Sequence, residues 1–232
     1  MSVVTMGSLL HLTEVAMSDD AVHVIVYTGA GDQAFCAGGD LSGSFVDDAI
    51  GLHRQRGQIA ELFRLMMRGG KPTIARVNGH ALAGGFGLAV ACDITICVED
   101  AKLGTTEVRV GLWPSMISAV LARVMPRKAA LELMLTGRLI TPDEAFRLGA
   151  VSRVVSREDL DSAVDEVVEN LLRLSPATLM LGKDSFNAMA DADVDAALDR
   201  LQGGLTEIAL TEDAREGVNS FLEKRSPDWK GA

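Results

Sequence analysis

Short apolar runs alternate with helix-like segments along the first half of the chain. Largely apolar runs of strand length occupy residues 23–28, 73–77 and 94–98. Apolar residues at helical spacing predict helices at residues 5–17, 58–68 and 85–92. Strands that alternate with helices in this way are typical of an α/β fold with parallel strands, which we therefore expect.

The second half of the chain is predominantly helical in pattern. Thr141, followed by a proline and then by Glu144, forms a capping box that predicts a helix start. One continuous apolar stripe at helical spacing crosses residues 160–172. A further helix is predicted to begin at Ser175, and from there to the end the pattern is helical only.

This change of pattern is the candidate domain boundary. We expect residues 1–173 to form the α/β core and residues 174–232 to form a separate helical region. Within the core, residues 42–54 mix polar and apolar positions without a clear period, and we interpret them as a mobile loop.

Composition fits a globular protein with one sizeable core. The chain has 232 residues, of which 48% are hydrophobic and 23% charged. Its longest uncharged stretch, from Val77 to Cys92, is shorter than the roughly 20 residues of a membrane span, and no secretory signal opens the sequence. We therefore expect no membrane partner. The three cysteines and four histidines show no metal-ligand spacing, so we expect no metal and a reducing cytoplasmic location.

Charge excludes one class of function. The formal net charge is −10, and no stripe of Lys and Arg is visible. Because phosphate contacts in nucleic-acid binding need clustered cations, we expect no nucleic-acid partner. A small anionic ligand remains compatible, since it needs only one or two local cations.

Two glycine-bearing turns carry the most specific chemical signal. They are Ala34–Leu41 (AFCAGGDL) and Gly79–Leu88 (GHALAGGFGL), and each follows an apolar strand-like run. Two backbone N–H groups on such turns can converge on one oxygen atom and stabilise an enolate or a tetrahedral oxyanion. Taken alone, the glycines are equally compatible with simple turn residues.

Four segments together resemble the crotonase superfamily, the enoyl-CoA hydratase/isomerase family. They are VIVYTGAGDQAFCAGGDL, residues 24–41; KPTIARVNGHALAGGFGLAVACDITICVEDAKLGTTEVRVGL, 71–112; MLTGRLITPDEAFRLGAVSRVV, 134–155; and EGVNSFLEKRSPDWKG, 216–231. The resemblance implies a spiral of strand-strand-helix turns, followed by a C-terminal all-helical region that packs in a homotrimer or a dimer of trimers. It also implies binding of an acyl-CoA thioester, with no cofactor beyond the coenzyme A of the substrate.

Carried over by position, the resemblance assigns roles to residues of both turns. The amides of Gly39 and Gly84 would hold the thioester oxygen, close to the N-terminus of the predicted 85–92 helix. The residues it implies for substrate binding are Ala37, Asp40, Leu41, Trp113, Lys224 and Arg225. The last two would present cations to the coenzyme A phosphates from a neighbouring subunit, although a solvated helix end explains them equally well.

The acid/base positions depart from the family pattern. Typical hydratases carry two glutamates; here the first position is Gly87, and the second is retained as Glu107. A third position, which holds Asp in some relatives, is Ser115. Burial among apolar neighbours would raise the pKa of Glu107 and suit it to proton transfer, whereas a surface pair with Arg109 is the alternative.

One glutamate suffices to move a proton from C2 to C4 of a 3-enoyl-CoA, so isomerisation is expected alongside hydration aided by Ser115 or ordered water. A non-catalytic acyl-CoA-binding protein of the same fold is the alternative. Relatives also begin with two strands that this sequence lacks before Met1, which leaves open the contribution of that segment to coenzyme A binding.

Overall fold

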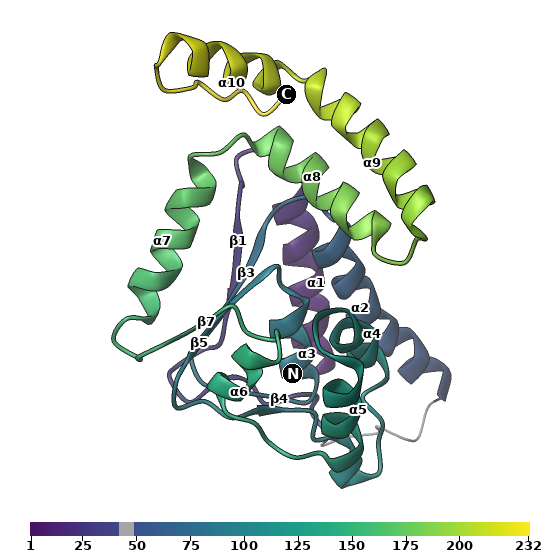
Figure 1. The fold of residues 1–232 in the computed structure, drawn as a ribbon. Coiled ribbons are helices and arrows are strands. Elements are labelled where there is room, and N and C mark those ends of the chain that lie inside the picture. The colour runs from purple at the N-terminus through teal and green to yellow at the C-terminus, as the bar shows by residue number, and fades with distance from the viewer. Residues whose placement is uncertain (42–48) are drawn as a thin grey trace.

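The computed structural model describes residues 1–41 and 49–232, in which strands and helices alternate before a helical C-terminal part (Figure 1). In chain order the elements are α1 (Val3–Ser18), β1 (Ile25–Thr28), β2 (Ala34–Cys36), α2 (Ala49–Arg68), β3 (Thr73–Val77), β4 (His80–Leu82), α3 (Gly84–Ala91), β5 (Ile94–Val98), β6 (Leu103–Gly104), the 3₁₀ helix η1 (Glu107–Val110), α4 (Ser115–Val124), α5 (Arg127–Thr136), α6 (Pro142–Arg147), β7 (Arg153–Val155), α7 (Leu160–Leu172), α8 (Pro176–Met189), α9 (Val194–Ala209) and α10 (Glu212–Glu223).

The larger sheet forms the centre of the core. Its four strands are parallel, in the order β1-β3-β5-β7. The two central strands are almost entirely buried, which explains why the sequence shows them as largely apolar runs rather than as alternating patterns. The helices α2, α3 and α7 pack around this sheet and complete the core.

A second, smaller sheet lies beside the first and consists of β2, β4 and β6, again all parallel. Its strands have only two or three residues each, and β4 is held on both sides. The His80 amide donates to the Gln33 carbonyl at 3.0 Å, and the Ala81 amide donates to the Lys102 carbonyl at 3.0 Å. Parallel pairing brings the carboxyl ends of all three strands to one edge.

The predicted α/β class with parallel strands is confirmed, with strands observed at 73–77 and 94–98 as expected. The prediction of a loop over 42–54 is wrong for residues 49–54, because α2 begins at Ala49; residues 42–48 lie outside the described part of the chain. The start of α2 joins the exposed Ile50 to the exposed polar residues His53, Arg54 and Arg56, so it lacks the apolar periodicity that marks a helix in sequence.

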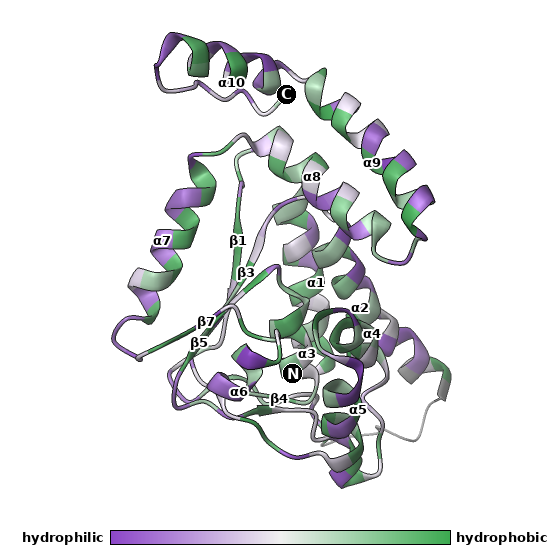
Figure 2. Ribbon diagram, viewed as in Figure 1, coloured by the Kyte–Doolittle hydropathy of each residue, from purple (hydrophilic) through white to green (hydrophobic). Residues whose placement is uncertain are grey.

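The C-terminal region is helical, as the pattern predicted. Lys183 of α8 ties this helix to the core: its ammonium group donates to the carbonyls of Met66 and Lys71 at 2.7 Å and lies 2.7 Å from Asp93 Oδ2. Beyond α8, α9 and α10 extend away from the sheets, and Figure 2 shows apolar and polar residues alternating along both. The boundary between residues 173 and 174 stays a prediction.

No helix within residues 1–41 and 49–232 is both long and apolar enough to cross a bilayer.

Candidate active site

The candidate catalytic residues follow the carboxyl ends of the three short parallel strands. Gly39 lies after β2, Gly84 lies two residues after the end of β4, and Glu107 begins η1, three residues after β6. Because β4 pairs with both β2 and β6 in parallel, segments far apart in sequence emerge at the same edge. Ligand sites in parallel α/β structures form at such edges.

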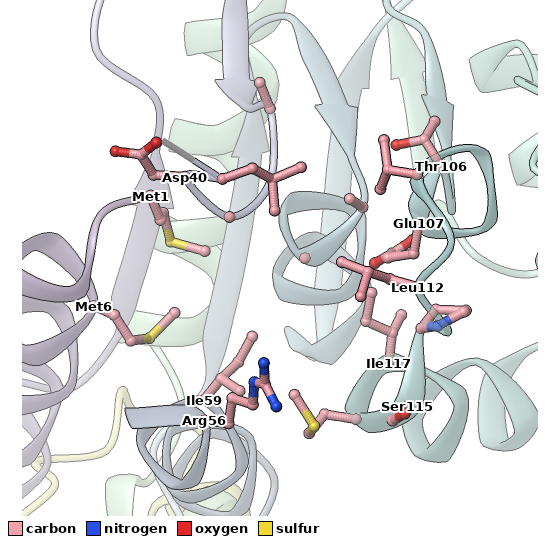
Figure 3. A pocket seen from close by; sticks show the side chains of 18 of the residues that line it. Met1, Met6, Asp40, Arg56, Ile59, Thr106, Glu107, Leu112, Ser115 and Ile117 are labelled. Carbon is pink, nitrogen blue, oxygen red and sulfur yellow. The ribbon is translucent and has the colours of Figure 1, made fainter. Parts of the chain in front are cut away.

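These segments enclose a cavity of about 470 Å³ (Figure 3). Eight of the ten predicted site residues line it: Ala37, Gly39, Asp40, Leu41, Gly84, Glu107, Trp113 and Ser115. The other lining residues are mostly apolar, and come from the N-terminus with α1, from α2, from the second glycine turn and from the segment that runs into α4: Met1, Ser2, Val3, Met6, Arg56, Gln58, Ile59, Ala83, Thr106, Val110, Leu112, Pro114, Met116 and Ile117. The cavity therefore combines an apolar lining with a few polar groups, as small-molecule sites do.

The two glycine turns are in direct contact. A Cβ added to Gly38 would lie 2.8 Å from the Cβ of Ala83 and 3.7 Å from the amide nitrogen of Gly84. Gly38 also has φ +98°, a backbone conformation that side chains disfavour. Only glycine thus permits the first turn to approach the second this closely.

Ala83 holds the second turn in a strained conformation, with φ 51° and ψ −129° immediately before α3. A non-glycine residue in such a region costs about 1–3 kcal/mol, and this strain is commonly found at functional sites. The Ala83 amide donates to the Gly104 carbonyl at 2.8 Å, which fixes the turn to β6. The turn thereby presents the Gly84 amide at the first position of α3.

The amides of Gly39 and Gly84 both belong to the cavity lining, and within the described residues neither donates a hydrogen bond to protein. An unpaired N–H at a helix N-terminus attracts negative charge, because the helix dipole adds to the N–H dipole. The arrangement is suited to hold a partly anionic oxygen.

Glu107 is the carboxylate at the apolar side of the cavity. Its Oε2 atom is buried and has no hydrogen-bond partner among the residues described. Burial raises the pKa of the Glu107 carboxyl above its usual value of 4.5, and a hydrogen bond from its own backbone amide opposes that shift. Arg109, the surface partner considered from sequence, is exposed and packs against Gly137 instead.

Trp113 lies in the loop before α4, and Ser115 is the first residue of that helix. The Ser115 hydroxyl faces the carbonyl of Trp113 at a long 3.4 Å, so it makes at most a weak hydrogen bond there. Trp113 is about half exposed while contributing to the lining. Asp40 lies on the side of the cavity opposite Glu107, where its amide donates to the Met1 carbonyl at 2.8 Å (Figure 3).

The structure places Lys224 and Arg225 elsewhere, at the C-terminal end of α10 and outside this cavity. Arg225 forms ion pairs with Glu216 at 2.5 Å and Glu223 at 2.6 Å. The predicted contact with coenzyme A phosphates from a neighbouring subunit stays a prediction.

Several lining residues escaped the sequence reasoning, chiefly Met6 on α1, Ile59 on α2 and Ile117 on α4. Each sits in a helix among other apolar residues, where an apolar residue facing a ligand is indistinguishable in sequence from one facing the core. Among residues 1–41 and 49–232, no group of three or more His, Cys, Asp or Glu side chains could hold a metal ion.

Comparison with known proteins agrees with this architecture. The sequence model of the enoyl-CoA hydratase/isomerase family matches residues 3–232. A carnitinyl-CoA dehydratase of Proteus mirabilis is 33% identical over 221 residues, covering 92% of this chain and 83% of that protein. An enoyl-CoA hydratase structure from Mycobacterium smegmatis superimposes with a TM-score of 0.94 at 30% identity, covering 99% of this chain and 89% of that one.

A Bacillus anthracis enoyl-CoA hydratase structure gives the same TM-score of 0.94 at 30% identity, covering all of this chain and 90% of that one. These likenesses confirm the spiral strand-strand-helix fold expected from the sequence segments. The chain therefore belongs to the enoyl-CoA hydratase/isomerase family.

Proposed function

We propose that this protein is an enzyme of the family that binds an acyl-CoA thioester, stabilises its enolate with two backbone amides and moves one proton with Glu107. The observation that carries the proposal is the buried Oε2 of Glu107, which has no hydrogen-bond partner among the residues described, in a cavity that Gly39 and Gly84 also line. The substrate itself supplies the coenzyme A, so no further cofactor is required.

The amides would bind the thioester oxygen. Charge accumulates on that oxygen when a proton leaves C2, and preformed N–H donors stabilise it without reorganisation. Loss of one such donor typically costs about 3 kcal/mol of transition-state stabilisation. The strained backbone of Ala83 supports this role, because such strain is commonly found at functional sites and Ala83 directly precedes Gly84 in the cavity lining.

Glu107 would then act as the single base and acid. Its carboxylate takes a proton from C2 of a 3-enoyl-CoA, and the C3–C4 double bond shifts to C2–C3 as the same proton is delivered to C4. The products are a 2-enoyl-CoA and the regenerated carboxylate, so atoms and electrons balance. A raised pKa favours this cycle, since it brings the two protonation states closer in free energy at neutral pH.

Hydration of a 2-enoyl-CoA is the second candidate reaction, favoured by the names of the similar proteins. It would add a water oxygen to C3 and a proton to C2. Gly87 supplies no second carboxylate for that route, and loss of a general acid or base usually costs ~10²–10⁴-fold in rate. We therefore favour isomerisation; a non-catalytic acyl-CoA-binding protein remains the alternative.

Oligomerisation belongs to the same proposal. The helices α9 and α10 expose large apolar side chains, among them Leu198, Leu205, Phe221 and Leu222. Exposed apolar patches of this kind mark protein interfaces. A homotrimer or a dimer of trimers in the cytoplasm would bury them and bring Lys224 and Arg225 of one copy toward the coenzyme A of another.

The test is incubation with a panel of 2-enoyl- and 3-enoyl-CoAs, with products followed by mass and by ultraviolet absorbance. Hydration adds the mass of water, whereas isomerisation leaves the mass unchanged. Glu107→Gln should abolish turnover while still binding a saturated acyl-CoA. Turnover of that variant at the wild-type rate would refute the proposal, and binding without any product from the wild type would support the non-catalytic alternative.

A further inference from the structure

Ile117 of α4 occupies the space that a side chain at Gly87 of α3 would need. A Cβ added to Gly87 would lie 2.8 Å from Ile117 Cγ1, 2.9 Å from Cγ2 and 3.3 Å from Cβ. Contacts below 3 Å between such carbons are repulsive, so a side chain at position 87 would overpack against this isoleucine unless Ile117 shifts. Both residues are buried, and α3 packs directly against α4.

Ile117 also forms part of the cavity wall. Figure 3 shows it next to Leu112, on the same side of the pocket as Glu107. Its branched side chain therefore touches position 87 on one side and the cavity on the other. The wall beside the carboxyl group of Glu107 is apolar as a result.

We propose that Ile117 is a specificity-determining residue that leaves Glu107 alone in proton transfer. This inference rests on the proposed function and adds a structural reason why isomerisation is favoured over hydration. By filling the space beside Gly87, Ile117 excludes both a second acid/base side chain and an ordered water from that wall. A proton taken by Glu107 then returns to the substrate, and water does not add to C3.

The packing half of the proposal is tested by a double-mutant cycle of Gly87→Ala and Ile117→Ala, in which the melting temperature Tm is measured. Gly87→Ala in the wild type should lower Tm by roughly 3–8 °C, because the new methyl group overpacks the site. In an Ile117→Ala background the same change should raise Tm, because the methyl group fills the vacated space and alanine favours the helix. Gly57→Ala on α2, where a Cβ meets nothing within 4 Å, reports the helix preference without overpacking.

The chemical half is tested by product ratio with 2-enoyl- and 3-enoyl-CoAs. Ile117→Ala should raise hydration relative to isomerisation by roughly 2–10-fold, the worth of one hydrogen bond to an ordered water. Val120→Ala is the matched control, since Val120 is buried in the same helix but does not line this cavity. It should lower Tm without moving the ratio.

Additive Tm changes in the cycle, or an unchanged ratio in an active Ile117→Ala variant, would overturn the inference while leaving the proposed function intact. Failure of the wild type to convert any enoyl-CoA would overturn the proposed function and the chemical half together. The double-mutant cycle in Tm would still decide whether the Ile117 side chain fills the space that a side chain at position 87 would occupy.

Discussion

The added Cβ of a residue at position 38 would lie only 2.8 Å from the Cβ of Ala83, so Gly38 and Ala83 hold the two glycine turns in contact. Gly38→Ala must therefore push the turns apart. Because the Gly84 amide directly follows Ala83, we expect kcat to fall by about 10²–10³-fold, the loss typical of one misplaced oxyanion donor. Steady-state kinetics with a 3-enoyl-CoA measures this fall in kcat.

Gly31→Ala is the control for this variant. Gly31 also has positive φ, +73°, but a Cβ there meets nothing within 4 Å. The Gly31→Ala variant should lose about 1 kcal/mol in the free energy of unfolding because of backbone strain, and its kcat should not change. An equal loss of activity in both variants would mean that strain, rather than the contact with Ala83, explains the effect.

Glu107→Gln should stabilise the protein at neutral pH. Burial raises the pKa of this carboxyl above 4.5, so ionisation is harder in the folded state than in the unfolded state. The folded state is therefore penalised above the raised pKa, and the penalty disappears as the pH falls through it toward 4.5. Thermal melts from pH 7.5 to 4.5 should show a Tm gain that shrinks with decreasing pH; a Tm below that of the wild type at pH 7.5 would contradict this account of the site.

Lys183→Met should release α8 from the core. The Lys183 side chain is 10% exposed and has three acceptors, including Asp93 Oδ2 at 2.7 Å. Removing it leaves a carboxylate without its cation, at a cost of roughly 2–3 kcal/mol in the free energy of unfolding, less than for a fully buried pair because Asp93 is partly exposed. Urea unfolding of the wild type and the variant measures this change in the free energy of unfolding.

The comparison variant is Lys230→Met. Its partner Asp228 lies at 2.5 Å, but both side chains are mostly exposed. Solvent screens a pair this exposed, so this variant should change the unfolding free energy little. A comparable loss in both variants would show that Lys183 does not anchor α8.

Light scattering should give a mass in solution that is a multiple of three times the 24.6 kDa chain. Leu205→Glu on α9 should reduce it, because Leu205 is 68% exposed and a charge there opposes burial in an interface. Leu12→Glu on α1, where the leucine is 64% exposed, should leave the mass unchanged. A monomeric wild type at micromolar concentration would contradict the assignment of residues 174–232 to assembly.

Sequence patterns predicted the parts of the fold that bury long apolar surfaces. The runs at 73–77 and 94–98 are central strands, and the helix start at Thr141 is observed, with the Thr141 hydroxyl accepting from the Glu144 amide at 3.2 Å. The Glu144 carboxylate pairs with Arg138 at 2.6 Å, so only this half of the predicted capping box is seen. The strands β2, β4 and β6 were not predicted from periodicity. Two or three residues are too few to show a period, and these strands form only because neighbouring strands supply their hydrogen bonds.

The candidate site, like the fold, could be predicted only in part from the sequence. Gly39, Gly84 and Glu107 were found because they stand in motifs, and the structure brings them to one cavity. Ile117 could not be found, because its contact with Gly87 joins helices whose relative placement the sequence pattern does not encode. The same limit applies to Lys224 and Arg225, whose expected role involves a second copy of the chain.

The central claim is that one carboxyl group carries the proton from C2 to C4. The most direct measurement supplies 3-enoyl-CoA deuterated at C2 in ordinary water and locates the label in the 2-enoyl-CoA product by mass and proton resonance. A measurable fraction of the deuterium should appear at C4 with the wild type, and Glu107→Gln should form no such product. A product with no label at C4, or a variant that still transfers it, would contradict the account.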